Sequence, residues 1–419
     1  MKRIVFSTVG SLGDLHPYIA IAKELQVRGH HPVIATTDRY KLLIESAGIA
    51  YAPLRPAEAQ FGGLESVAAR LFDPYRGPEY LVREMVMPYI REQYGDIAAA
   101  CTGADLLVTH PLTMAGPLVC AKTGLPWVSS VLAPASLMSS TDRPLLNSAA
   151  WAHWLRGLGA APYRAVTKLA ELLARRWERP LHKLRSELGL PPAAHAALLQ
   201  GQFSPQLNLA LFPRVLAEPQ ADWPANTVLT GFARYDGAVA DSNTRQELNG
   251  FLAAGERPVV FALGSSVVMI AGDFWDKAIA ACVKLGRRAL LLTGTPLARP
   301  LPPDVKAFDY LPYSEVFPAA AAIVHQGGIG TFAQALAARR PQLVVPVAFD
   351  QPDNARRAVG LGLARSIPMR KLTASTLAIE LAALLGEPSY AACAAQRFDG
   401  LDGGERRAAD ALLGGQAIE

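Results

Sequence analysis

The chain has 419 residues, of which 51% are hydrophobic and 18% are charged, a balance typical of folded globular proteins and unlike that of disordered chains. The four cysteines, Cys101, Cys120, Cys282 and Cys393, lack metal-ligand spacing, and the net charge of +5 is not gathered into a run with interleaved aromatics. These features argue against a disulfide-stapled protein, a zinc protein and a nucleic-acid-binding protein. At about 150 residues per domain, the length indicates two or three domains.

The first 35 residues predict a βαβ unit. A β-branched run over 3–9 ends in the glycine-rich turn GSLGD, Pro17 is expected to open a helix that ends at Gly29, and HPVIATT is the next strand. Further strands are predicted at IAYAPL, DLLVTH, PWVSSV and LNLALF. The regions 58–100 and 136–200 interrupt this βα rhythm.

A second βα series follows a proline-rich stretch that begins after residue 213. Its predicted strands are RPVVFALGS, RRALLLTG, VKAFDYLP, AAIVHQGG, PQLVVPVAF and ARSIP. The sequence therefore predicts an α/β protein with two Rossmann-like domains that face each other across a cleft. We expect a first domain over 1–213, a linker over 214–236, a second domain over 237–395 and a helical tail over 396–419. With neither a run of about 20 apolar residues nor a signal-peptide pattern, a cytoplasmic location is expected.

The segment IVHQGGIGTFAQAL predicts a strand, a glycine-rich turn and a helix. Gly327, Gly328 and Gly330 would let the backbone approach a ligand closely. The first N–H groups of the helix, with the hydroxyl of Thr331, would then bind a phosphate. The alternative is that the glycines only allow tight packing between the strand and the helix.

The next strand ends in Asp350 and Gln351, at the edge where open α/β sheets bind ligands. A carboxylate beside a carboxamide suits the vicinal hydroxyls of a sugar, because the pair can both accept and donate hydrogen bonds. The alternative is that the two residues only cap the following helix.

Three segments, GSLGDLHPYIAIA, HQGGIGT and PQLVVPVAFDQPDNA, together resemble the family 1 nucleotide-sugar glycosyltransferases with two Rossmann-like domains, the GT-B fold. The resemblance covers nearly the whole chain and extends to bacterial sterol, macrolide and rhamnolipid glycosyltransferases. HQGGIGT with FDQPDNA is most similar to rhamnosyltransferase B-like proteins. The resemblance implies that the first domain binds the acceptor and the second domain binds the nucleotide-sugar donor.

The resemblance also assigns donor-binding roles. It implies that Asp350 and Gln351 hold the donor sugar, that Tyr310 stacks on the nucleobase, and that Ser265, Gly330 and Thr331 contact the diphosphate. The histidine that binds the diphosphate in the family aligns with Gln326, and His325 lies one residue earlier. Either Gln326 supplies a neutral amide donor, or His325 takes this role.

Asp14 matches the position of the catalytic base in the family. Because a free carboxyl group is a weak base at neutral pH, a histidine partner is expected. His110 ends the fourth strand, which lies beside the first in the order 3-2-1-4-5, so an Asp14–His110 pair is preferred and His16 is the alternative. These assignments predict an inverting glycosyltransferase that needs no metal or cofactor, with the helix start at 327–331 stabilising the leaving nucleoside diphosphate.

Aromatic and methionine side chains in 58–100 and 136–200 predict a hydrophobic acceptor with one reactive hydroxyl, although core packing is the alternative for each residue. The residues expected at the acceptor are Gly13, Phe61, Met85, Trp151 and Trp154. A hydroxy-fatty-acid lipid is the first expectation, an aromatic or polyketide aglycone the second, with a dTDP-rhamnose or UDP-glucose type of donor. The basic helix over 164–185 indicates peripheral contact with an anionic membrane. Two further classes remain open, a non-catalytic activator and a nucleotide-sugar epimerase.

Overall fold

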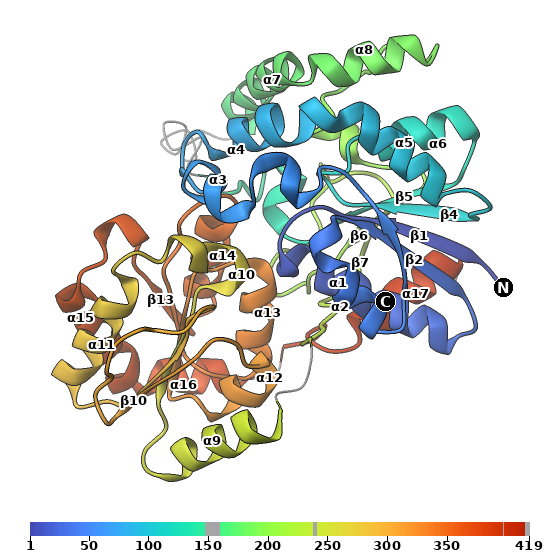
Figure 1. The fold of residues 1–419 in the computed structure, drawn as a ribbon. Helices are drawn as coiled ribbons and strands as arrows, with labels where there is room; N and C mark the ends of the chain where they lie inside the picture. Colours follow the sequence, from blue (N-terminus) through green and yellow to red (C-terminus); the bar gives the residue numbers. More distant parts are fainter. Residues whose placement is uncertain (147–159, 238–240, 397, 415–419) are drawn as a thin grey trace. The chain divides into compact units, whose positions relative to one another are not determined.

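The computed structural model describes residues 1–146, 160–237, 241–396 and 398–414 (Figure 1). The chain divides into two compact units, one formed by Met1–Tyr235 with Asp399–Glu419 and the other by Asp236–Phe398. Each unit has one parallel β-sheet with helices on both faces (Figure 1), which confirms the predicted α/β class. The strands are nearly continuous apolar runs, as expected where both faces of a sheet are covered.

The first unit holds seven parallel strands in the order β3-β2-β1-β4-β5-β6-β7. Their bounds are β1 Arg3–Ser7, β2 His31–Thr36, β3 Ala50–Pro53, β4 Leu106–Thr109, β5 Trp127–Val131, β6 Leu207–Ala210 and β7 Thr227–Leu229. Ser7 at the end of β1 pairs with Thr109 at the end of β4. The predicted neighbourhood of the first and fourth strands is therefore confirmed, and the loops that follow both strands meet.

The helices of the first unit are α1 Leu12–Val27, α2 Lys41–Ser46, α3 Leu64–Leu71, α4 Gly77–Tyr80, α5 Ile90–Ala100, α6 Gly116–Thr123, α7 Ala160–Trp177, α8 Arg179–Glu187 and α17 Gly404–Leu413. The start of α1 differs from the prediction, because Pro17 lies inside the helix and does not open it. Ser11 is the N-cap, and its reciprocal hydrogen bonds with Asp14 form a capping box that starts the helix at Leu12, five residues before Pro17. Asp14 therefore stands on the first turn of α1 and not in a loop.

The first unit includes most of two segments that were expected to lie outside the domains. The predicted linker over 214–236 contributes β7, which pairs with β6 and extends the sheet. The tail forms α17, which packs on α1 and places Asp410 in an ion pair with Arg28. A hydrogen bond also joins these two segments, because Phe232 N–H donates to the carbonyl of Gly400 at 3.1 Å.

The second unit holds six parallel strands in the order β10-β9-β8-β11-β12-β13. Their bounds are β8 Val259–Ala262, β9 Ala289–Leu292, β10 Val305–Phe308, β11 Ala322–His325, β12 Gln342–Val344 and β13 Ala364–Ser366. The helices are α9 Ser242–Ala253, α10 Gly264–Val267, α11 Phe274–Leu285, α12 Tyr313–Val316, α13 Ile329–Ala337, α14 Gln351–Gly360, α15 Ala374–Gly386 and α16 Pro388–Ala395. Across the described ranges no single helix is long and apolar enough to cross a membrane, although the bent pair α15–α16 passes on length and composition.

Candidate active site

The carboxylate of Asp14 is fixed at the head of α1. Its Oδ2 accepts the backbone N–H of Ser11 at 2.7 Å and the Ser11 hydroxyl at 2.8 Å, and Gly13 N–H donates to the same hydroxyl oxygen at 3.2 Å. Gly10 has a φ of +146°, and a Cβ there would come within 2.3 Å of the Asp14 Oδ2. The glycine and the serine of the turn therefore hold the carboxylate in one orientation.

His110 follows β4 directly and lies against this carboxylate. Its Nε2 is 3.4 Å from the Oδ1 of Asp14, and its Nδ1 accepts the backbone N–H of Leu112 at 3.3 Å. A neutral imidazole with its Nδ1 lone pair used in this way carries its proton on Nε2, the nitrogen that faces Asp14. The structure thus brings the two residues of the preferred pair together.

Electrostatics keep Asp14 ionised. Burial would raise the pKa of the carboxyl group, but the hydrogen bond and electrostatic attraction from His110, with the two hydrogen bonds from Ser11, outweigh burial and leave the pKa below its usual value. Asp14 is therefore a carboxylate at neutral pH, held by donors on three sides, with 30% of its side chain exposed. A partly exposed, ionised carboxylate can accept a proton from a bound hydroxyl group.

The alternative histidine, His16, is not brought to this pair. Residues two apart on a helix point in different directions, and the His16 ring packs edge-on against Tyr235 with centroids 5.2 Å apart. Its Nε2 is buried without a hydrogen-bond partner among the described residues, and burial lowers the pKa of His16 to about 4. His16 is therefore a neutral packing residue in this structure.

In the second unit, His325 and Gln326 have different surroundings. His325 is fully buried at the end of β11, where its Nε2 lies 2.9 Å from Gln342 Oε1 and its Nδ1 accepts the N–H of Gly327 at 3.1 Å. Burial lowers the pKa of His325 to about 4, so the ring is neutral. Gln326 Nε2 donates to the hydroxyl of Thr331 at 3.3 Å, while its buried Oε1 has no partner among the described residues. Of the two residues, only Gln326 keeps unused hydrogen-bonding capacity.

The glycine-rich turn between β11 and α13 is packed closely against the start of α14. Gly327 has a φ of +85°, and a Cβ there would meet Val344 Cγ1 at 2.8 Å and the carbonyl of Gln351 at 3.1 Å. The N-cap of α13 is Gly328, so no side chain caps the first turn. The N–H groups at the start of α13, from Ile329 to Thr331, are therefore available to an anion.

Asp350 and Gln351 begin α14, beside this turn. Gln351 Oε1 accepts the backbone N–H groups of Val347 and Ala348 at 2.9 and 3.2 Å, and this leaves its Nε2 to donate. Phe349 has a φ of +56°, which is uncommon for a bulky side chain and typical of a functionally constrained turn. Asn354 Nδ2 donates both to Asp350 Oδ2 at 2.7 Å and to the carbonyl of Gly327 at 2.9 Å. The hydrogen bonds of Asn354 thus tie the candidate sugar-binding carboxylate to the glycine-rich turn.

Ser265 and Tyr310 complete the predicted donor residues. Ser265 follows Gly264, whose φ is +67° and where a Cβ would meet Gln326 Nε2 at 2.2 Å, so the loop after β8 lies directly beside Gln326. Tyr310 follows β10, is 50% exposed, and donates its hydroxyl to the carbonyl of Asp236 at 2.9 Å. β8, β11 and β12 are adjacent in the sheet, so only Tyr310 stands apart from the other predicted residues.

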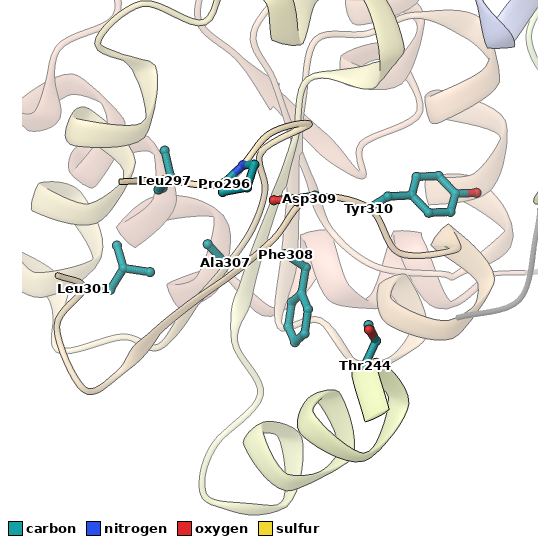
Figure 2. Close-up of a pocket in the computed structure, with 8 residues that line it drawn as sticks. All are labelled: Thr244, Pro296, Leu297, Leu301, Ala307, Phe308, Asp309 and Tyr310. Carbon is teal, nitrogen blue, oxygen red and sulfur yellow. The ribbon is translucent and has the colours of Figure 1, made fainter. Parts of the chain in front are cut away.

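A cavity of about 510 Å³ lies beside Tyr310 at the β9 and β10 end of the sheet. Figure 2 shows that Phe308 points toward Thr244 of α9, while the ring of Tyr310 extends away from Pro296 and Leu297. The lining residues are Thr244, Pro296, Leu297, Leu301, Ala307, Phe308, Asp309 and Tyr310. A cavity at the carboxyl ends of parallel strands, lined by both apolar and polar side chains, is suited to a flat, partly apolar group.

The residues expected at the acceptor are only partly placed. Gly13 lies on the first turn of α1, next to Asp14. Phe61 is half-buried at the end of a 3₁₀ turn, and Met85 is buried within the helical turn over 81–86. Trp151 and Trp154 lie outside the described residues. The structure therefore locates Gly13 beside the candidate base and leaves the role of the others a prediction.

Three contributing residues were not predicted, although the sequence carries a spacing signal for two of them, Tyr18 and Asn354. Tyr18 lies one turn after Asp14 on α1, and its ring stands perpendicular to that of His110 with centroids 6.4 Å apart. Asn354 has the same i, i+4 spacing from Asp350. Asp236 accepts the N–H groups of Tyr313 and Ser314 at 3.0 and 2.7 Å, and it lies in the stretch that was expected to be a linker.

Two segments match known families. Residues 4–77 match the glycosyltransferase family 28 N-terminal domain, and residues 289–401 match the erythromycin biosynthesis protein CIII-like C-terminal domain. The chain is 31% identical over 405 residues to O-mycaminosyltylonolide 6-deoxyallosyltransferase of Streptomyces fradiae. The matched region covers 93% of this chain and 91% of that enzyme.

Solved structures agree on the fold. The glycosyltransferase SnogD from Streptomyces nogalater has a TM-score of 0.68 at 20% identity and covers 99% of both chains. The spinosyn rhamnosyltransferase SpnG complexed with thymidine diphosphate has a TM-score of 0.63 at 20% identity and covers 94% of both chains. With two parallel Rossmann-like sheets and similarity over nearly its whole length, the chain therefore belongs to the nucleotide-sugar glycosyltransferases of the GT-B fold that are related to macrolide glycosyltransferases.

Proposed function

We propose that this glycosyltransferase transfers a deoxysugar from a dTDP-sugar to a hydroxyl group of a polyketide aglycone, with inversion at the anomeric carbon. The observation that carries the proposal is the 31% identity, over nearly the full length, to a transferase of 6-deoxyallose. A relative of the same fold binds thymidine diphosphate. These relatives favour the polyketide acceptor over the hydroxy-fatty-acid lipid that the sequence motifs put first.

In this proposal Asp14 is the base and His110 is the residue that orients it. The Nδ1 of His110 is occupied by Leu112 and its Nε2–H points to Asp14, so no imidazole lone pair is free to take a proton from a hydroxyl group. Asp14 accepts the proton of the acceptor hydroxyl, the acceptor oxygen bonds to the anomeric carbon, and the bond from that carbon to the diphosphate oxygen breaks. The bonding electrons leave with the nucleoside diphosphate. His110 keeps the carboxylate in one orientation during the transfer.

The leaving diphosphate is stabilised in this proposal by the start of α13. The uncapped N–H groups after Gly328 and the positive end of the helix dipole favour a doubly charged group. Gln326 adds a donor if its carboxamide turns by 180°, because Oε1 then accepts the proton of the Thr331 hydroxyl and Nε2 becomes available to a phosphate oxygen. Asp350 and Gln351 hold the sugar hydroxyls, and Asn354 fixes Asp350 relative to the turn.

We place the nucleobase against the half-exposed ring of Tyr310, next to the 510 Å³ cavity. The hydroxyl of Tyr310 is held by the carbonyl of Asp236, so the ring has a fixed position before the donor binds. An aromatic ring held in this way offers a stacking surface at little entropic cost.

The test is a transfer assay of the purified protein with dTDP-rhamnose, other dTDP-deoxysugars and UDP-glucose against four acceptor classes. The acceptors are macrolide aglycones, aromatic polyketides, hydroxy fatty acids and free sugars, and the products are resolved by mass spectrometry and by the anomeric coupling constant in NMR. We expect inverted product with a polyketide acceptor and a dTDP-deoxysugar. Transfer only to hydroxy fatty acids would reject the polyketide acceptor. Free sugar released without acceptor would instead favour an epimerase, and donor binding without turnover a non-catalytic activator.

A further inference from the structure

The outward side of α7 exposes an unusual set of leucines. Leu169, Leu172 and Leu173 are 51%, 62% and 43% exposed. Leu169 is three residues before Leu172 and four before Leu173, so the three side chains lie on one side of the helix and form one continuous stripe. Single exposed apolar residues are common on protein surfaces, but a stripe of adjacent leucines is typical of a surface that binds something. Figure 1 shows α7 and α8 following one another along the outer side of the first unit.

Cations surround this stripe at both ends. Arg164 and Lys168 precede the leucines and Arg176 follows them at four-residue spacing, and all three side chains are exposed. Two more exposed cations, Arg179 and Lys183, continue the series along α8. None of the five forms an ion pair with a described residue, and their charge is therefore not neutralised locally.

The carboxylates of this helix face the other way. Glu171 Oε1 lies 3.0 Å from His195 Nδ1 and accepts the backbone N–H of Ala196 at 3.1 Å. Glu178, fully buried at the junction with α8, accepts the N–H groups of Ala197 and Leu198, each at 2.8 Å. One side of α7 is therefore occupied by the 195–198 segment, and the opposite side carries leucines and positive charge without an acidic side chain.

We infer that this leucine stripe, Leu169, Leu172 and Leu173, with its flanking cations, is a docking surface for an anionic lipid bilayer. The leucines enter the boundary between head groups and acyl chains, while the long arginine and lysine side chains reach the lipid phosphates. The charge pattern favours this occupant over a second copy of the chain, because two copies would bring like charges together. Docking here would hold the enzyme where apolar acceptors concentrate, but the inference rests on α7 and α8 alone and not on the identity of the acceptor.

The test is co-sedimentation of the full chain with vesicles of phosphatidylcholine, alone or mixed with phosphatidylglycerol. We expect binding only to the anionic vesicles, weakened by added salt, and reduced at least about tenfold by Leu172→Ser or Lys168→Glu. Matched controls on α11 are Val283→Ser, where the valine is 60% exposed, and Lys284→Glu, an exposed cation without an ion pair to a described residue. Neither control should change the binding.

Equal binding to both kinds of vesicle, no binding to either, or an equal loss in the controls would overturn the inference. Sedimentation velocity supplies a separate check, because self-association that Leu172→Ser abolishes would show that a second copy covers the stripe. Each variant should keep wild-type melting and wild-type transfer to a water-soluble acceptor, so that unfolding is not mistaken for lost docking. Transfer activity without vesicle binding would reject this inference and leave the proposed function intact.

Discussion

The imidazole of His110 turns its protonated nitrogen toward the carboxylate of Asp14, 3.4 Å away. A histidine used as a base would need a free lone pair, and Leu112 occupies the only one. In the proposed mechanism the carboxylate therefore accepts the proton and the imidazole orients the carboxylate. Mutations at the two positions should have different effects on the reaction.

Replacing Asp14 by Asn should lower kcat by about 10²- to 10⁴-fold, because the amide cannot accept the proton of the acceptor hydroxyl. The Asn oxygen can still accept the N–H of Ser11, so α1 should remain capped and the melting temperature should change little. Single-turnover kinetics and the Kd for dTDP, measured by calorimetry, separate the chemical step from donor binding. A variant that keeps more than a tenth of the wild-type kcat would exclude Asp14 as the base.

Replacing His110 by Ala should move the acid limb of the kcat/KM profile to higher pH. In the wild type His110 helps to lower the pKa of Asp14, so the carboxylate stays ionised further into acid than an ordinary carboxyl group. Since a depressed pKa stabilises the fold above the unfolded-state pKa, this contribution is lost as pH falls through the folded pKa. The His110→Ala variant should therefore lose less stability than the wild type as the pH falls. Urea denaturation at a series of pH values measures this difference. An acid limb that stays in place, or moves lower, would contradict the pairing.

Gln326→Ala should weaken dTDP binding by about tenfold or more, the effect of removing one hydrogen bond to a charged group. His325→Ala should leave the affinity of the folded protein unchanged and cost about 1–3 kcal/mol of stability, because it leaves Gln342 unpaired in the core. Calorimetric titration and chemical denaturation measure the two effects separately. The reverse ranking of affinities would show that His325 faces the phosphates. Gln326→His should also add a pH dependence to donor binding near the usual histidine pKa of about 6.5.

Asp350→Ala should abolish transfer without unfolding the protein, because the residue starts a helix at the end of the sheet and is not part of the core. Asn354→Asp should raise the KM for the donor about tenfold, since an aspartate cannot donate to the carbonyl of Gly327 and repels Asp350. An exposed carboxylate in the same unit, Asp304, is a matched control for the loss of charge in the Ala variant. Near-normal turnover in Asp350→Ala would reject the sugar-binding role.

Transfer should survive incubation with EDTA if, as proposed, the uncapped first turn of α13 supplies the charge stabilisation that a metal ion would otherwise give the leaving group. The assay compares initial rates before and after chelation, and again after adding Mg²⁺. If chelation abolishes transfer and Mg²⁺ restores it, a cation and not the helix stabilises the leaving group.

The sequence predicted the order of the first five strands and the meeting of Asp14 with His110, because both follow from the βα rhythm and the topology of parallel sheets. It could not decide between His325 and Gln326, since all four residues of β11 are buried and the usual alternation of polar and apolar residues is missing. The start of α1 was misplaced because Pro17 is a stronger helix-start signal in a sequence than the Ser11–Asp14 capping box. β7 was missed because a three-residue strand within a proline-rich stretch has almost no periodicity.

The return of α17 to the first unit has a consequence for building hybrid enzymes. The helix that carries Asp14 packs on α17 from the far end of the chain, and the Arg28–Asp410 ion pair joins the C-terminal end of α1 to α17. A hybrid joined at a single point near residue 235, with the rest taken from a relative, would exchange α17 together with the second unit. The foreign helix would then have to fit this α1. Hybrids should instead be spliced twice, at 235–236 and at 398–399, so that α1, with the candidate base, keeps its native contacts with α17.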